Sequence, residues 1–246
     1  MQLNFAAREL AIKLVYYGPA LSGKTTNLRS LHDQIGGGCG RLMTLETKDD
    51  RTLFFDVLPV SFRMGGESGL NLRLKVYTVP GQVVHASTRR LVLQAADGVV
   101  FVADSQLSEV ENNAAAFLDL RANLKQMGRS VRDMPLVIQF NKRDVPGARS
   151  DEDVQELARK GAEPVYAAVA VRGEGVIPSF FGLLDVTFRR LEVEHKLSER
   201  FGMTPRDFLE RTATHLGWGG KVDELLAKCR VSGAPASVDA SVRRAP

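Results

Sequence analysis

The sequence predicts an α/β fold in which a mostly parallel sheet of six strands is covered by helices on both faces. Strand-like and helix-like segments alternate along the chain as far as residue 196, and the runs at 99–104 and 136–141 are apolar without polar alternation. Such alternation indicates βαβ units, and uninterrupted apolar runs are typical of strands buried on both faces. The content of 44% apolar and 25% charged residues is ordinary for a globular protein.

The first strand and the first helix flank a glycine-containing turn. Residues 10–17 form an apolar run that stops at Gly18, which predicts a buried strand. Residues 24–35 have helical character, and the three consecutive glycines at 36–38 end this helix.

The next two strands form a predicted hairpin. Segments 52–62 and 70–78 have strand-like composition and are joined around Gly65-Gly66. Two strands joined in this way pair antiparallel, so the hairpin adds one antiparallel edge strand to the sheet. Apolar and polar residues alternate in the second segment, which predicts that one of its faces is drier than the other.

The second half of the domain continues the alternation. A helix is expected at 110–127 because apolar side chains recur there at helical spacing. Ser150, followed by acidic residues, predicts the N-terminus of the next helix. A last strand at 165–171 and a last helix at 176–196 complete the predicted sheet and its cover.

Charge, cysteine content and hydropathy limit the classes of function. The chain has 33 Lys and Arg against 29 Asp and Glu, and this small excess does not favour binding to nucleic acid. Cys39 and Cys229 match neither a disulfide framework nor a zinc-ligand spacing. The longest apolar stretch, 165–171, is too short to cross a bilayer, and the chain ends carry no lipidation motif. We therefore expect a cytoplasmic protein without a direct lipid anchor.

The strongest functional signal is residues 18–25 (GPALSGKT), which match G-x-x-x-x-G-K-[ST] between a predicted strand and a predicted helix. In that context the loop amides and the helix N-terminus bind phosphates. Lys24 would reach the β- and γ-phosphate oxygens, and Thr25 would ligate magnesium. The predicted phosphate-binding residues are Gly18, Ala20, Leu21, Ser22, Gly23, Lys24, Thr25 and Thr26.

A second motif, residues 141–144 (NKRD), predicts which base is bound. It follows a strand at its carboxyl end, where open parallel sheets bind ligands. The Asp144 carboxylate can accept hydrogen bonds from N1–H and the 2-amino group of guanine, a pair of donors that adenine lacks. Asn141 would support the base edge, and the Lys142 stem would cover the ring.

A third motif, residues 78–82 (TVPGQ), lies at another strand end. There the Gly81 amide would face a γ-phosphate, and Gln82 would orient the attacking water. With the three motifs in this order, residues 1–196 resemble a Ras-like small GTPase, and more closely the bacterial gliding-motility and polarity group, the MglA-like GTPases. The segments that carry the resemblance are 15–19, 50–56, 77–82, 97–105 and 141–144.

The resemblance implies a P-loop small-GTPase fold and hydrolysis of GTP to GDP and phosphate with Mg2+. It implies that Thr52 closes on the metal and the γ-phosphate, so that Thr25 and Thr52 are the expected metal ligands. It also implies that Arg51 stabilises the transition state and that Gln82 is the catalytic glutamine. The backbone at Ala170 and Val171 would read the guanine carbonyl.

Two positions depart from the Ras-like pattern. Thr78 replaces an aspartate, as it does in the resembled group, and this removes a charge that would hold magnesium through water. Ala20 replaces a glycine beside the γ-phosphate, and its Cβ could crowd Gln82 or Arg51. This second departure bears on the hydrolysis rate more than on nucleotide binding.

The sequence thus predicts a GTP-binding switch with slow intrinsic hydrolysis. By resemblance, a roadblock-type dimer would stimulate hydrolysis, and the effectors would act in cell polarity or gliding motility. The alternative hypothesis is a GTP-binding scaffold with little or no hydrolysis. A third hypothesis, an ATP-dependent kinase, is disfavoured by the NKRD motif. We expect a GTP-binding domain at 1–196, a short helical extension at 197–230 that nucleotide binding does not require, and a disordered tail at 231–246.

Overall fold

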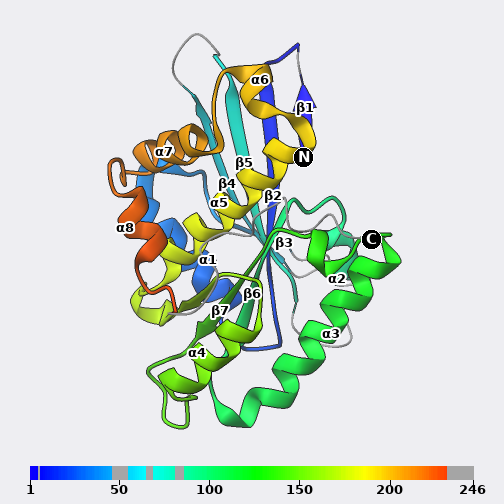
Figure 1. Cartoon of the computed structure of the whole chain (residues 1–246), viewed down its shortest axis with the longest axis vertical. Coiled ribbons are helices and arrows are strands. Elements are labelled where there is room, and N and C mark those ends of the chain that lie inside the picture. Colours follow the sequence, from blue (N-terminus) through cyan, green and yellow to red (C-terminus); the bar gives the residue numbers. More distant parts are fainter. Residues whose placement is uncertain (5, 46–54, 65–68, 81–85, 232–246) are drawn as a thin grey trace.

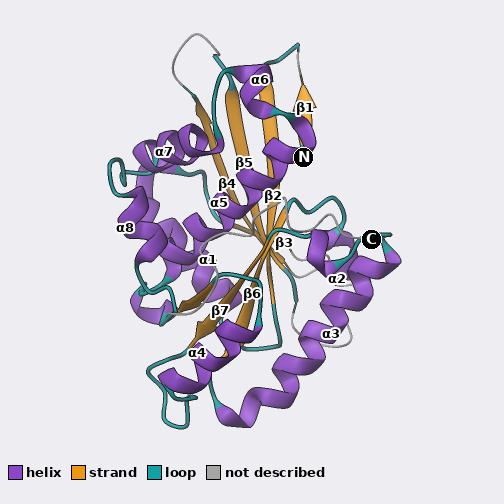
Figure 2. Cartoon of the chain, in the orientation of Figure 1, coloured by secondary structure: helices purple, strands orange, loops and turns teal. Residues whose placement is uncertain are grey.

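The computed structural model describes residues 1–4, 6–45, 55–64, 69–80 and 86–231. Within these residues, eight strands form one mixed sheet in the order β3-β4-β5-β2-β6-β7-β8, with β1 paired to β2. Helices cover both faces of this sheet (Figures 1 and 2). The predicted α/β class with a mostly parallel core is therefore confirmed.

The strands from β1 to β8 are, in order, Gln2–Asn4, Glu9–Tyr17, Met43–Leu45, Phe55–Arg63, Asn71–Thr78, Gly98–Asp104, Leu136–Asn141 and Val165–Ala167. The helices from α1 to α8 are, in order, Lys24–Ile35, Ala86–Leu93, Val110–Gln126, Asp151–Lys160, Val176–His195, Leu197–Phe201, Pro205–His215 and Val222–Ala227. Short 3-10 turns are η1 (Gly36–Gly38), η3 (Leu107–Glu109), η4 (Val131–Asp133) and η5 (Ala170–Arg172).

Strands β5, β2, β6, β7 and β8 are parallel to one another and form the centre of the sheet. Every residue of β6 is buried, as its apolar run predicts. Apolar side chains form one core between the sheet and helices α1, α5, α7 and α8, and a second core on the opposite face under α2, α3 and α4. The carboxyl ends of β2, β6 and β7 are thereby held in one rigid frame.

The predicted count of six strands, with one antiparallel edge strand, is wrong. Strands β1 and β3 have three residues each, too few to give a periodic signal in the sequence. Strand β3 pairs antiparallel outside β4, and β1 pairs antiparallel with β2. The predicted hairpin pairing of β4 with β5 is confirmed, with Leu58 opposite Val76. The predicted turn at Gly65-Gly66 and residues 52–54 lie outside the described residues.

The last predicted strand, 165–171, ends early, because β8 stops at Ala167 and the chain continues into η5. Two glycines allow this change of direction. Gly173 and Gly175 have φ of 77° and 73°, and a Cβ on Gly175 would lie 2.1 Å from the Ala167 carbonyl oxygen. The apolar residues that favoured a longer strand therefore form a turn directly after β8.

Helix α5 is surrounded by protein over residues 176–188, every one of which is buried. The C-terminal helices supply part of this cover. Thr204 caps α7 through a capping box with Asp207, and Phe208 of α7 stacks on Phe188 with ring centroids 5.1 Å apart. Helices α7 and α8 thus share a core with the sheet and α5. Among the described residues, no helix is long and apolar enough to span a bilayer.

Candidate functional site

The loop between β2 and α1 depends on two glycines that have little space around them. Gly18 has φ of 143°, and a Cβ there would lie 2.2 Å from the carbonyl oxygen of Val102 on β6. Gly23 has φ of 97°, and a Cβ there would lie 2.2 Å from Nδ2 of Asn141 on β7. A side chain at either position would be strained and would clash, so the backbone of this loop is set by the two neighbouring strands.

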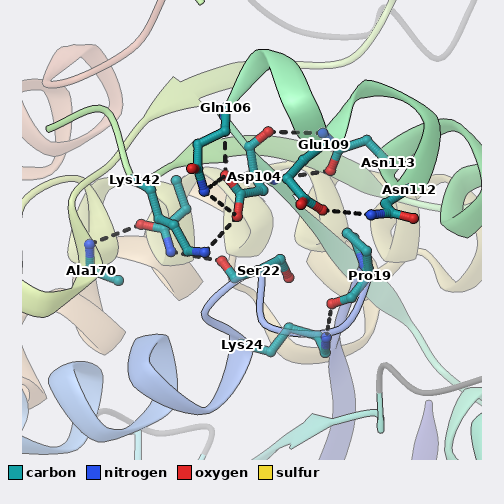
Figure 3. A network of polar contacts seen from close by, with 11 residues as sticks. Pro19, Ser22, Lys24, Asp104, Gln106, Glu109, Asn112, Asn113, Lys142 and Ala170 are labelled. Carbon is teal, nitrogen blue, oxygen red and sulfur yellow. Dashed lines mark hydrogen bonds and ion pairs between the residues drawn. The ribbon is translucent and has the colours of Figure 1, made fainter. Parts of the chain in front are cut away.

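Lys24 opens α1 and turns its ammonium group back toward the loop. Its side chain is only 6% exposed, and Nζ donates to the carbonyl oxygens of Gly18 (3.0 Å) and Pro19 (2.5 Å) (Figure 3). Burial, and then the charge of Arg89, lowers the pKa of Lys24 to about 8. An anion at this loop would stabilise the charged form. The loop therefore suits a phosphate group by charge as well as by shape.

A cavity of about 710 Å³ lies beside this loop, within the usual size range of small-molecule sites. Its walls come from the loop, from α1 and from the ends of β4 and β5. The lining residues are Ala20, Leu21, Gly23, Lys24, Thr25, Thr26, Arg29, Thr44, Phe55, Asp56, Thr78, Val79 and Pro80.

Asp56 is a site residue that the sequence motifs did not reveal. It is only 6% exposed, and its carboxylate accepts hydrogen bonds from the hydroxyls of Thr25 (2.7 Å), Thr78 (3.0 Å) and Thr44 (2.8 Å). Its own backbone N–H donates to Oγ1 of Thr78 (2.9 Å). The arrangement depends on the antiparallel register of β4 and β5, in which Val57 lies opposite Tyr77. That register is not visible in the sequence.

This cluster places a buried negative charge beside the first turn of α1. Hydroxyl and carboxylate oxygens are the donors that magnesium prefers, so the chemistry of the set fits that ion. No group of three or more His, Cys, Asp or Glu side chains is arranged for a metal among the described residues. Among the described residues, Thr25 and Asp56 are the oxygen donors placed to hold a cation here.

Asn141 joins the loop after β2 to the turn after β8. Its side chain is only 2% exposed; Nδ2 donates to the Ser22 carbonyl oxygen (2.8 Å), and Oδ1 accepts from the Ala170 N–H (2.9 Å). Figure 3 shows Ser22 and Ala170 at the two ends of these contacts. The Ala170 amide is thus engaged by Asn141, whereas Val171, the next residue of η5, is 77% exposed.

Two further residues of the NKRD motif, Lys142 and Asp144, lie close to charged side chains from other parts of the fold. Lys142 has φ of 62°, and its Nζ lies 2.5 Å from Oδ2 of Asp104 at the end of β6 (Figure 3). Asp144 is partly exposed. Its Oδ2 lies 3.9 Å from Nη1 of Arg172. The long distance leaves this carboxylate able to accept hydrogen bonds from a ligand.

The predicted residues therefore fall into two sets. The structure brings residues 18–26 together with Asn141, Lys142, Asp144, Ala170 and Val171 at the carboxyl ends of the central strands. Arg51, Thr52, Gly81 and Gln82 lie outside the described residues. This fold and this loop define a P-loop nucleotide-binding protein of the doubly wound α/β class.

Comparison with known proteins narrows this class. The chain matches the model of the ADP-ribosylation factor (Arf) family over residues 2–180. It is 42% identical over 191 residues to the mutual gliding-motility protein MglA of Myxococcus xanthus (strain DK1622), covering 77% of this chain and 97% of that protein. ADP-ribosylation factor-like protein 6 of Caenorhabditis elegans is 27% identical over 170 residues, which cover 67% of this chain and 80% of that protein. The chain therefore belongs to the Arf/Ras-like small GTPases, as an MglA-like member.

The resemblance of the motifs to small GTPases is thus confirmed at the level of the family. Proteins of this family bind GTP and GDP and hydrolyse GTP, and the chain is a GTP-binding switch of that kind. The roles of individual residues go beyond this result and belong to the proposal below.

Asn141→Ala should lower the free energy of unfolding by about 2–3 kcal/mol in protein without nucleotide. The change leaves the buried Ser22 carbonyl and Ala170 amide without their partner, and each loss costs about 1 kcal/mol or more. Urea denaturation followed by circular dichroism measures the difference. Asn112→Ala, at an exposed asparagine of α3 that bonds Glu109, is the matched control and should stay within about 0.5 kcal/mol of the parent. Equal stability of the two variants would contradict the role given to Asn141.

Proposed function

We propose that this protein binds GTP and GDP through residues 18–26 and 141–144 and hydrolyses GTP slowly on its own. The observation that supports this most directly is the Asn141 side chain, which brings the phosphate-binding loop, the NKRD motif and the turn after β8 into one site. Guanine nucleotide fits both halves of that site, because one half offers cationic and amide groups and the other offers a carboxylate.

In the phosphate half, Lys24 would exchange its two carbonyl partners for phosphate oxygens, which favour its charged form. The loop amides and the N-terminus of α1 would bind the same oxygens. Thr25 would ligate Mg2+, and Asp56 would orient the Thr25 hydroxyl and contribute negative charge behind it. The metal, when bound, supplies positive charge against the phosphates. Asp56 would thus replace the charge that Thr78 lacks.

In the base half, Asp144 would accept from N1–H and the 2-amino group of guanine. The Lys142 stem, fixed by the contact of its ammonium with Asp104, would cover one face of the ring. Because the Ala170 N–H is bound to Asn141, the exposed Val171 is the better placed of the two residues to offer its amide to the guanine carbonyl.

The hydrolytic step rests on residues outside the described part of the chain. By resemblance, Arg51 would stabilise the transferring phosphoryl group, Thr52 would close on the metal, and Gly81 with Gln82 would position the water. Ala20 is exposed at the cavity, so its methyl group can reduce the space available to Gln82 or Arg51. This supports a slow intrinsic rate and keeps a GTP-binding scaffold as the alternative.

The cellular process is proposed from the relative alone. The name of the Myxococcus xanthus protein assigns it to gliding motility, and its 42% identity to this chain supports a role in gliding motility. A role in cell polarity is proposed from the motif resemblance. A roadblock-type dimer that stimulates hydrolysis, and polarity or motility effectors, are proposed from the motif resemblance.

Asp144→Asn should exchange guanine preference for xanthine preference. Xanthine carries a carbonyl where guanine has its 2-amino group, so an amide donor fits xanthine and leaves guanine donors unpaired. GTP affinity should fall on the order of a hundredfold or more, and XTP affinity should rise. Competition of unlabelled GTP, XTP and ATP against a fluorescent guanine nucleotide measures both effects. Unchanged GTP affinity would remove Asp144 from the base site, and stronger binding of ATP than GTP by the parent would favour the kinase reading.

Asp56→Asn should weaken magnesium binding about 10- to 100-fold, as loss of a group that orients a metal ligand usually does. The readout is the rate of GDP dissociation over a range of free magnesium concentrations, which requires no hydrolysis. Asp33→Asn, at an exposed aspartate of α1, is the matched control. The same magnesium dependence in both variants would show that Asp56 only holds β4 and β5 together.

Arg51→Ala should leave GTP affinity within a few-fold while hydrolysis stimulated by a partner falls on the order of a thousandfold. In the transition state, negative charge is spread over the oxygens of the transferring phosphoryl group, and a nearby cation stabilises it. Bound GTP in the ground state does not require this cation. Single-turnover hydrolysis at saturating partner measures the effect, with Gln82→Leu expected to behave similarly. Full stimulation of the Arg51 variant would show that this arginine is a surface charge.

A further inference from the structure

The outer edge of β8 is closed by the C-terminal segment of the chain. Strand β8 pairs with β7 on one side. On its other side, Val231 N–H donates to the Val165 carbonyl oxygen (2.9 Å), and Ala167 N–H donates to the Cys229 carbonyl oxygen (2.8 Å). Tyr166 lies opposite Arg230 in antiparallel pairing between these two bonds. The segment from Cys229 to Val231 therefore extends the sheet by one short strand-like piece.

Strand β8 leads directly into the proposed guanine-binding loops. Ala168 N–H donates to the Phe140 carbonyl oxygen (2.9 Å), and the Ala168 carbonyl accepts from Arg143 N–H (3.2 Å) in the NKRD motif. Two residues later the Ala170 amide binds Asn141. A shift of β8 would move these three contacts together, so the position of β8 sets the position of both loops.

The C-terminal extension as a whole comprises residues 197–231. Besides the pairing with β8, side-chain contacts anchor it at two places that lie far apart. Near β8, the Tyr166 hydroxyl donates to the Leu226 carbonyl oxygen (3.2 Å) at the end of α8. At the far end of α7, the His215 ring stacks on Phe62 of β4 with centroids 4.2 Å apart, and its Nε2 lies 3.1 Å from the Gly38 carbonyl oxygen. Figure 1 shows α7 and α8 along the side of α5 and α1. The extension thus spans from the end of α1 to the edge of β8.

This extension lies outside the part of the chain that the Arf family model matches, which ends at residue 180. It also contributes no residue to the cavity of about 710 Å³ at the phosphate-binding loop. Its backbone hydrogen bonds to β8, at Val165 and Ala167, are contacts with the strand that leads into the proposed guanine-binding loops. A shorter domain could therefore bind nucleotide without it, and the extension would change the kinetics rather than supply a ligand-binding group.

We propose that residues 197–231 position the guanine-binding loops by closing the edge of β8, and thereby slow the release of guanine nucleotide. The inference rests on the proposed function, since it assigns guanine binding to the NKRD motif and the turn after β8. Release of the base requires these loops to separate. The backbone hydrogen bonds at Val165 and Ala167 oppose that separation because they hold β8 on both sides.

The test uses two full-length variants at one position. Val231→Pro removes the N–H that donates to Val165, whereas Val231→Ala keeps it and shortens only the side chain. Dissociation of fluorescent GDP, chased with excess GDP at saturating magnesium, should be roughly tenfold faster in the proline variant and within about twofold of the parent in the alanine variant. In the same protein without nucleotide, amide hydrogen exchange at residues 168–173 should accelerate in the proline variant, while exchange in α1 stays unchanged.

Equal GDP dissociation from the two folded variants, with unchanged exchange at 168–173, would overturn the inference. If the proline variant does not fold, Tyr166→Phe replaces it, since this change removes the hydrogen bond between β8 and α8 without altering the backbone. It should then raise GDP dissociation about two- to threefold, and an unchanged rate would overturn the inference. Failure of the parent protein to bind GDP would instead contradict the proposed function, and the exchange measurement would still decide whether the extension positions the loops.

Discussion

The two hydrogen bonds of the Asn141 side chain hold together three loops that are far apart in sequence. The Ser22 carbonyl, the end of β7 and the Ala170 amide meet at one buried amide group. Gly23 is confined by the same side chain, because any Cβ there would strike its nitrogen. One buried polar group therefore fixes both the shape of the phosphate-binding loop and its distance from the base-binding loops. A buried amide suits this task because it donates and accepts at once, and leaving either function unpaired is costly.

The pocket holds one positive and one negative side chain, Lys24 of α1 and Asp56 of β4. These two elements come together only in the folded chain. Lys24 is buried with carbonyl partners only, and its pKa is lowered by burial and by Arg89. On the other side of the pocket, the Asp56 carboxylate is surrounded by threonine hydroxyls. Each charge is hydrogen-bonded, yet neither has an ion-pair partner of opposite sign among the described residues. Both are therefore placed to gain when a ligand that carries phosphates and a cation enters between them.

The sequence predicted the parts of this structure that local pattern determines. Helix α1 begins and ends at the predicted residues, and the predicted cap at Ser150 is present, because a helix start depends on a few adjacent side chains. Strands β1 and β3 are too short to show periodicity. The apolar run after β8 turns because its conformation is set by Gly173 and Gly175, not by apolar composition.

Long-range geometry was the part that the sequence could not supply. Asp56 becomes a site residue only through the register of β4 against β5, and the second hydrogen bond of Asn141 requires the turn after β8. The sequence motifs identified the chemistry of each loop. They did not show that Asn141 binds both the loop after β2 and the turn after β8. The motif at 78–82 has Thr78 where Ras-like proteins have an aspartate. In the folded chain, Asp56 of the neighbouring strand β4 places a carboxylate beside the Thr78 hydroxyl.

The burial of α5 over residues 176–188 also has a consequence for molecular recognition. A surface helix of an α/β domain ordinarily keeps one polar face in water, where other proteins can reach it. Here Phe208 and its neighbours occupy that face, and every residue from Val176 to Phe188 is covered. A protein that recognises α5 in a shorter family member would meet α7 instead. Other faces of the chain, such as that of α3 with its exposed Leu118, stay accessible.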